Sequence, residues 1–257
     1  MLGEAVRLKI IDKNPCAEVK DLKEEETVRV ILTADEFKSL FPVDWSAVWD
    51  KEIVYKANLL AACSGLRIGE LRGLRGEDIF ENYIHVHGQY LIKKYVDHTK
   101  TKADRTIPIS ASMKKMLDGL ILNNGKCYVF SVDGGKTPIT NDWLNKGFNR
   151  ALKNIGINYE EKLKRNLSFH AWRHFLNTLL LTSNVSIKKV QNVTGHKSLK
   201  MTDRYTHFDN TQFTEVVAVQ NNLLAFNSSD NQIIHAEVIE NDVFQNEAVK
   251  HKRKKKV

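Results

Sequence analysis

Apolar residues recur at helical spacing along most of the chain, and this periodicity predicts a largely helical protein. Thr33-x-x-Glu36 has the form of a capping box and begins the first expected helix, while Gly65 suits the left-handed position after the second. Arg67 then lies at the junction between the second and third helices. The expected helices span residues 33–40, 45–63, 67–71, 110–122, 141–154, 169–182, 186–193 and 211–225.

Residues 79–109 depart from that periodicity. The segment 83–87 alternates apolar with polar side chains, 90–96 continues extended, and 105–109 closes a small antiparallel sheet. The polar stretch 100–104 is expected to form the tip between the last two strands. The predicted fold class is therefore mixed α/β, mainly α-helical, with one small three-stranded antiparallel sheet inserted early.

Composition narrows the class of protein only moderately. The chain has 257 residues, of which 42% are hydrophobic and 27% charged, as in an ordinary globular protein. The net charge of +8 favours a polyanionic partner, although many basic proteins bind no nucleic acid. The sequence contains neither an apolar run of membrane-spanning length nor a signal-peptide core, so we expect no membrane segment and a cytoplasmic location.

The two ends of the chain differ from the middle. Residues 1–30 are polar and linker-like, residues 31–225 form the predicted folded domain, and residues 226–257 are expected to be flexible. The basic end, 250–256, is interpreted as a solvated tail, with a DNA-binding arm as the alternative.

The three cysteines, Cys16, Cys63 and Cys127, are widely spaced and odd in number. They form neither a disulfide framework nor a zinc pattern. We expect each of them to pack in the core.

Five residues in order suit chemistry on a phosphodiester. The guanidiniums of Arg67 and Arg173 can each bind phosphate oxygens bidentately. The hydroxyl of Tyr205, with an ordinary pKa of about 10, is a weak nucleophile until a base takes its proton and positive charge faces the phosphate. His170 and His196 can supply the base and a further phosphate donor. This chemistry needs no carboxylate cluster, so no metal is implied.

Local helix geometry supports part of this arrangement. With Ser168 as the N-cap, His170 and Arg173 lie in the first turns of a helix and share one face. Helix N-termini bind phosphate, and their dipole disfavours a charged imidazole, which keeps His170 able to accept a proton. His174 lies near the same face, and we interpret it as structural.

Each candidate residue also has an ordinary structural interpretation. Arg67 could form a surface ion pair with Glu70, His196 could cap a helix after Gly195, and Tyr205 could pack its ring. The joint pattern favours the catalytic interpretation, because all five residue types occur in order at plausible spacing.

That ordered set resembles the tyrosine recombinase, or phage integrase, family. The resemblance covers residues 31–225, all of that family's catalytic domain, and the segment 11–15 resembles the linker that precedes such domains. The segments that carry it are 64–71, 99–101 with 105–108, 170–174, 194–196 and 202–207.

The resemblance implies a role for each residue. Arg67 and Arg173 would bind the non-bridging oxygens of the scissile phosphate. Tyr205 would attack phosphorus, giving a 3′-phosphotyrosyl link and a free 5′-hydroxyl. His170 would assist removal of the tyrosine proton, and His196 would donate a hydrogen bond to the phosphate.

A lysine is implied as the general acid that protonates the departing 5′ oxygen. Lys100 matches the family's lysine in its sheet hairpin, with Lys102 and Lys93 as the nearest rivals. The ester conserves the bond energy, so the resemblance implies neither ATP, nor a metal, nor another cofactor.

The implied partner is double-stranded DNA, with a homo-oligomer, a tetramer, at synapsis and a monomer in solution. A relaxing topoisomerase that uses similar residues is one alternative function. A DNA-binding regulator without catalysis is another, although it would not need Arg67, Lys100, His170, Arg173, His196 and Tyr205 together.

The sequence departs from the family pattern in small ways. Thr194 replaces a usual leucine, and Asn184 stands where glycine commonly ends a helix, which is mild because Asn tolerates the left-handed region. The residues before 30 are too few for the helical domain with which integrases clamp DNA. We therefore expect a catalytic piece of a longer protein, a truncated gene product or a naturally minimal member.

The sequence supports neither a P-loop nor a metal site. Gly134-Gly-Lys-Thr137 resembles the end of a P-loop, but Phe130 occupies its first glycine position. A histidine metal site would lack a carboxylate at ligand spacing, and Arg173 would repel the cation.

Overall fold

The computed structural model describes residues 2–17, 19, 31–99, 104–195 and 213–225. The chain divides into two compact units, residues 1–30 and 31–257, and each is described by itself. In the first unit, helix α1 (Leu2–Arg7) lies in a segment where we expected no helix.

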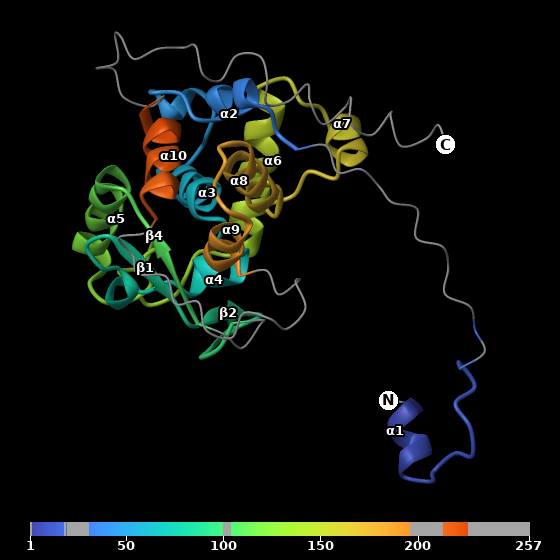
Figure 1. The fold of residues 1–257 in the computed structure, drawn as a ribbon. Coiled ribbons are helices and arrows are strands. Elements are labelled where there is room, and N and C mark those ends of the chain that lie inside the picture. Colours follow the sequence, from blue (N-terminus) through green and yellow to red (C-terminus); the bar gives the residue numbers. More distant parts are fainter. Residues whose placement is uncertain (1, 18, 20–30, 100–103, 196–212, 226–257) are drawn as a thin grey trace. The chain divides into compact units, whose positions relative to one another are not determined.

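The second unit is mainly helical, as the sequence predicted, and it carries small antiparallel sheets (Figure 1). The expected fold class, mixed α/β and mainly helical, is confirmed. Its α-helices are α2 (Ala34–Leu40), α3 (Glu52–Ser64), α4 (Ile68–Gly73), α5 (Ala111–Asn124), α6 (Asn141–Asn154), α7 (Tyr159–Lys164), α8 (Ala171–Thr182), α9 (Ile187–Thr194) and α10 (Thr214–Ala225). Its strands are β1 (Tyr83–Val86), β2 (Gln89–Leu91), β3 (Lys94–Val96) and β4 (Arg105–Pro108), and its 3-10 helices are η1 (Trp45–Ala47) and η2 (Gly76–Asp78).

Local capping explains several of the helix boundaries. Thr33 accepts from the backbone N–H of Glu36 and completes the expected capping box of α2. Gly65 ends α3 with a φ of 66°, and Asn184 takes a φ of 58° after α8, so both left-handed positions are confirmed.

The predicted helix 45–63 is wrong in its first part. Asp44 caps only the short turn η1, and α3 begins after Lys51, whose backbone is extended. The reason is tertiary packing, because the buried Trp49 donates its indole N–H to the carbonyl oxygen of Leu40 at 2.6 Å. A continuous helix could not bring Trp49 to the end of α2.

The predicted three-stranded sheet is also wrong in detail. In the described residues, β1 pairs with β4, from Tyr83 opposite Pro108 to Val86 opposite Arg105, and β2 pairs separately with β3. The run 90–96 folds back on itself at Ile92, whose φ is 51°. An isoleucine in the left-handed region is unusual, so the sequence carries no signal of this turn. Most of the expected tip 100–104 lies outside the described residues.

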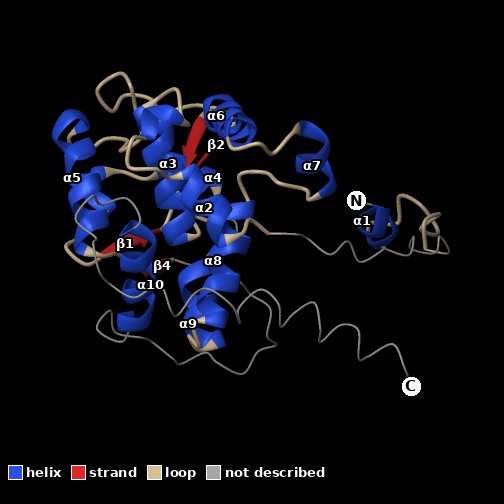
Figure 2. Cartoon of the chain, turned by 90° about the horizontal axis from the view of Figure 1, so that it is seen from above, coloured by secondary structure: helices blue, strands red, loops and turns tan. Residues whose placement is uncertain are grey.

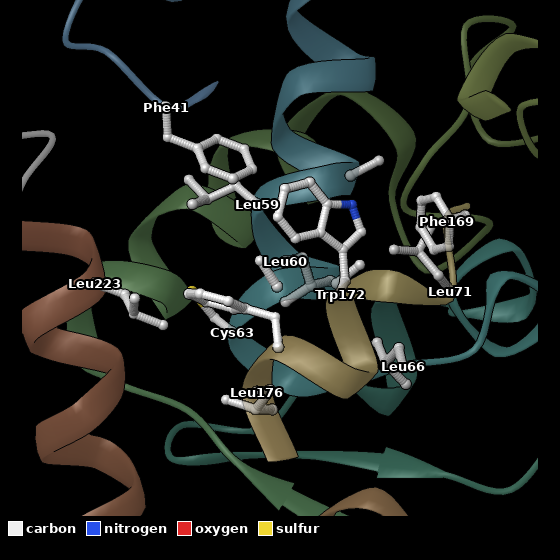
Figure 3. Packing of buried hydrophobic residues seen from close by; sticks show 14 of the residues in the cluster. Phe41, Leu59, Leu60, Cys63, Leu66, Leu71, Phe169, Trp172, Leu176 and Leu223 are labelled. Atoms are coloured by element: carbon white, nitrogen blue, oxygen red, sulfur yellow. The ribbon is translucent and has the colours of Figure 1, made fainter. Parts of the chain in front are cut away.

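Helix α3 lies at the centre of the helices, with α10 on one side and α8 on the other (Figure 1). Trp172 of α8 is fully buried and donates its indole N–H to Asn58 of α3 at 2.8 Å. Figure 3 shows the Trp172 ring against α3 with Phe41 beside it, and their ring centroids are 5.3 Å apart. Trp172 therefore links α8 to α3 through Asn58 and packs against Phe41 at the end of α2.

A buried glutamine connects α10 to the rest of the core. The amide nitrogen of Gln220 donates to the carbonyl oxygens of Cys63 and Pro108, and its oxygen accepts from the backbone N–H of Ser110. The same grouping is visible from above, where β1 and β4 lie beside α5 and α10 (Figure 2). Gln220 therefore joins α10 to the ends of α3 and β4.

The cysteine prediction holds for one residue in three. Cys63 is fully buried in α3, whereas Cys16 and Cys127 are exposed. Cys127 lies in the bend that follows α5, outside the buried faces of the helices. Within the part of the chain that the structure describes, no helix combines the length and apolarity that crossing a bilayer requires.

Candidate active site

The junction between α3 and α4 positions Arg67. Gly65 turns the chain in the left-handed conformation, and Arg67 is the extended N-cap of α4. The backbone N–H of Arg67 donates to Glu70 Oε2 at 2.9 Å, and its Nη1 donates to Glu70 Oε1 at 2.7 Å. The ion pair considered from sequence therefore exists, but it is not a surface pair, because the Glu70 side chain is completely buried.

Glu70 is shared between two arginines. Arg105 Nη1 donates to Oε1 at 3.1 Å and Arg105 Nη2 donates to Oε2 at 2.7 Å, so the carboxylate accepts four N–H bonds in all. Burial would raise the pKa of Glu70, but the hydrogen bonds and charges of Arg105 and Arg67 outweigh burial and lower it to about 2. Glu70 is therefore ionised at neutral pH.

Arg173 is buried from the first turn of α8, with 1% of the residue exposed. Its Nη1 donates to the carbonyl oxygen of Gly65 at 2.9 Å, at the end of α3. Burial first, and then the charges of Arg67 and Arg105, lower the pKa of Arg173 to about 9. It still carries its charge at neutral pH.

Three guanidiniums and one carboxylate thus form one cluster, in which three positive charges less one negative leave a net charge of two. Its members are Arg67, Arg105, Arg173 and Glu70. The structure brings together the two arginines that the sequence singled out. Such a cluster favours the binding of an anion, because its charges are partly buried and water screens their attraction less than at the surface.

The C-terminal end of α9 contacts two arginines of the cluster through its carbonyl oxygens. Arg67 Nη2 donates to the carbonyl oxygen of Gly195 at 3.3 Å, and Arg105 Nε donates to that of Val193 at 3.0 Å. Gly195 ends α9 with a φ of 65°. The next residue along the chain is the candidate His196.

The start of α8 lies two positions later than expected. The N-cap is not Ser168, because the helix begins only at Ala171 and Ser168 lies in the preceding turn, where its carbonyl oxygen accepts from the backbone N–H of Ala171. His170 is itself the N-cap residue, with a helical backbone, and its side chain is exposed. His174 is half-buried, and its ring lies perpendicular to that of His170 at a centroid distance of 4.9 Å.

Lys100, Lys102, His196 and Tyr205 lie outside the described residues, as does the tail 226–257. Lys93 is exposed in the turn between β2 and β3. The chain leading to Lys100 is anchored, because Gln89 donates its amide N–H to the carbonyl oxygen of His98 at 2.9 Å and Thr99 is fully buried. Among the described residues, no three His, Cys, Asp or Glu side chains are grouped to hold a metal ion.

Sequence reasoning missed the roles of Glu70 and Arg105 in this cluster. Glu70 carried one available signal, since it stands at the third position of α4 and completes a capping box with Arg67. Arg105 lies in a segment that carries the family resemblance, but nothing in the sequence indicated its partners, because positions 70 and 193 are distant from it along the chain.

The sequence profile of the phage integrase family matches residues 21–212 of this chain. A tyrosine recombinase of Thermosipho africanus is 30% identical over 205 residues, which cover 77% of this chain and 64% of that protein. The integrase of Enterobacteria phage 434 is 29% identical over 218 residues, which cover 79% of this chain and 53% of that protein. The chain thus spans between about half and two thirds of the length of these relatives.

Solved structures show the same fold. A dimer of lambda integrase residues 75–356 bound to a COC′ core site superimposes with a TM-score of 0.56 at 25% identity, covering 80% of this chain and 71% of that one. The Tn1549 transposon integrase, in complex with transposon right end DNA, gives a TM-score of 0.57 at 24% identity, covering 89% and 71%.

Proposed function

The chain belongs to the phage integrase family, and from this membership we propose that it is a site-specific DNA strand transferase that breaks and rejoins DNA through a 3′-phosphotyrosyl intermediate. The observation that carries the proposal is the convergence of Arg67 and Arg173 in one cluster of net positive charge beside the end of α9. Such a cluster suits a phosphodiester, whose negative charge increases when an oxygen nucleophile attacks phosphorus.

Tyr205 is the proposed nucleophile. Its hydroxyl oxygen attacks phosphorus and the bond from phosphorus to the 5′ oxygen breaks. His170 assists removal of the tyrosine proton. Arg67 and Arg173 bind the non-bridging oxygens, and His196 donates a further hydrogen bond to them. Lys100 protonates the departing 5′ oxygen. A 5′-hydroxyl from a partner strand then reverses these steps, so that the number of ester bonds is unchanged and neither ATP nor a metal is consumed.

The proposed partner is double-stranded DNA, with several copies of the chain assembled at synapsis. Relatives support this, since one solved structure is of a lambda integrase tetramer bound to a Holliday junction. We propose a tetramer on DNA, a monomer in free solution and a cytoplasmic location. Relaxation of DNA by a topoisomerase-like reaction and binding without catalysis are less favoured alternatives.

The proposal is tested by trapping the covalent intermediate. The protein is incubated with a library of nicked duplexes that contain a randomised region, and SDS-stable protein–DNA adducts are captured and sequenced. A nick allows the short 5′ product to diffuse away, so adducts accumulate and reveal the preferred site. Tyr205→Phe removes one oxygen, and we expect it to abolish adducts while leaving the unfolding curve and noncovalent DNA binding nearly intact. Adducts of undiminished yield from this variant would exclude Tyr205 as the nucleophile.

A further inference from the structure

Arg105 is the member of the cluster with no assigned function. It is the first residue of β4, and its side chain is only 5% exposed. Two of its nitrogens form a parallel fork with Glu70, and its Nε donates to the carbonyl oxygen of Val193. These three hydrogen bonds direct its nitrogens at α4 and α9, so Arg105 is poorly placed to bind a phosphate itself.

The aliphatic part of Arg105 also packs against the end of α9. A Cβ atom at Gly195 would lie 3.2 Å from Arg105 Cδ and 3.4 Å from its Nε. The chain therefore passes close over the guanidinium at the residue that precedes His196. Arg105 therefore positions the C-terminal end of α9 in two ways. Its side chain packs against Gly195, and its Nε donates to the carbonyl oxygen of Val193.

The charge of Arg105 has a separate consequence. Glu70 contacts both the backbone and the side chain of Arg67, so on its own it would neutralise the charge that Arg67 presents. The fork from Arg105 compensates Glu70 instead, because bidentate pairs between arginine and carboxylate are strong and geometrically specific. Arg67 and Arg173 then keep two positive charges for the phosphate, which matches the two negative charges of a phosphodiester under attack by a tyrosinate.

We propose that Arg105 is a positioning residue for DNA cleavage: it compensates the buried charge of Glu70 so that Arg67 remains available to the phosphate, and it fixes the end of α9 that leads into His196. This inference rests on the proposed function. It assigns Arg105 no contact with the substrate.

The test compares Arg105→Gln with the double variant Arg105→Gln/Glu70→Gln, on a nicked duplex selected by adduct capture and at saturating DNA. Arg105→Gln leaves an uncompensated carboxylate against Arg67, and we expect the rate of adduct formation to fall by roughly 10²-fold. Adding Glu70→Gln removes that carboxylate and is expected to restore the rate by about tenfold. A double variant as slow as, or slower than, Arg105→Gln would overturn the compensation of Glu70.

A matched control separates this effect from the loss of any buried ion pair. Arg165 forms a similar fork with Glu36, at 2.6 and 2.7 Å, and donates to the carbonyl oxygen of Ile31. Arg165→Gln is expected to lower the unfolding midpoint about as much as Arg105→Gln while leaving the rate of adduct formation within about twofold of the parent. Equal loss of rate in both variants, assayed below their melting temperatures, would show that Arg105 acts only through stability. Arg105→Lys retains the charge and not the fork, and we expect it to recover part of the rate.

A second readout needs no cleavage activity. The carboxyl carbon of Glu70, identified by its absence in Glu70→Gln, is followed by NMR against pH in labelled full-length protein. We expect no titration from about pH 5 to 8 in the parent and an upward shift of the titration in Arg105→Gln, because a buried carboxyl with fewer cationic partners has a raised pKa. The rates of adduct formation are compared at a pH above this titration, where the carboxyl of Glu70 is ionised in both proteins. If the parent forms no adducts, the proposed function fails. Absence of a shifted titration in Arg105→Gln would independently show that Arg105 does not compensate Glu70.

Discussion

A guanidinium that binds phosphate must stay charged although burial opposes its charge. Arg173 is buried and lies near two other arginines, yet its pKa of about 9 leaves it protonated at neutral pH. Glu70 contributes to this, since its ionised carboxylate favours the charged form of Arg173. The same desolvation that lowers this pKa strengthens the attraction between Arg173 and an anion. A buried charge is therefore consistent with a binding function here.

The role of a single lysine can be tested by changing the leaving group. If Lys100 protonates the 5′ oxygen, Lys100→Ala should form adducts on an ordinary phosphodiester roughly 10²- to 10⁴-fold more slowly. A substrate with sulfur at the 5′ bridging position needs little protonation, because a thiolate leaves readily, and the variant should recover most of its rate on it. The rates are measured in single turnovers on matched nicked duplexes.

Lys102→Ala is the matched control for this experiment, since the two lysines are two positions apart. If only Lys102→Ala regained its rate on the substrate with the 5′ bridging sulfur, Lys102 would be the general acid. If Lys100→Ala slowed adduct formation equally on both substrates, Lys100 would have a positioning role and would not be the general acid. The parent should retain its rate in excess EDTA, and a loss there would contradict a metal-independent mechanism.

At the scale of elements, α4 and β2 approach each other unusually closely. A Cβ atom at Gly73 would lie 2.8 Å from the Cα of Gln89 and 2.9 Å from its carbonyl carbon. Because backbone atoms cannot rotate away, Gly73→Ala must separate α4 from β2, and we expect a loss of about 1–3 kcal/mol in the free energy of unfolding. Urea unfolding of the variant measures this loss.

Gly69 provides the control on the same helix. A Cβ atom there would meet only ordinary contacts, the nearest being 3.4 Å from Leu91 Cδ2. Alanine also favours the helix over glycine, so Gly69→Ala should be neutral or stabilising by up to about 1 kcal/mol. Comparable destabilisation by both substitutions would mean that close approach to β2 is not what requires glycine at Gly73.

The elements that the sequence predicted well are those with local signals. The helix 141–154 was expected with the bounds that the structure shows, and Thr140 caps it. The separate hairpin of β2 and β3 was missed because Ile92 has no turn chemistry, and helix α7 was missed although Asn158 caps it. Helix 45–63 failed because the bond from Trp49 to Leu40 is tertiary and overrides helical periodicity.

At the scale of the whole molecule, the same division applies to the site. Arg67 and Arg173 could be identified from the sequence, since each lies in a recognisable local pattern. The compensation of Glu70 by Arg105 could not, because it depends on how β4 packs between α4 and α9. The net charge of +8 indicates a polyanionic partner but does not say where on the surface charge is left uncompensated.

Two ionisable groups are expected to shape the pH dependence of stability. Glu70 has a folded pKa lowered to about 2, so its contribution is present above its unfolded value of 4.5 and is lost as the pH falls through 2. His87 lies between Asp78 and Asp97, at 2.9 Å from each. Burial would lower the pKa of His87, but hydrogen bonds and charges from both carboxylates outweigh it and raise the pKa above 6.5. Its contribution is therefore present below 6.5 and is lost as the pH rises through the folded pKa.

The His87 contact predicts a decline in stability as the pH rises above 6.5. Tyr95 and His85 also face this imidazole, but the two carboxylates dominate its charge interactions. We expect the urea midpoint of the parent to fall as the pH rises above 6.5 and through the folded pKa of His87, where the imidazole loses its proton. His87→Gln keeps an amide that can donate to one carboxylate but cannot titrate, so its midpoint should be lower at the acidic end and should fall less over this range. His85→Gln, on the neighbouring half-buried ring, is the control and should keep the slope of the parent. If His87→Gln declined as steeply as the parent, the bridge between η2 and the segment leading to Lys100 would not be the source of the pH dependence.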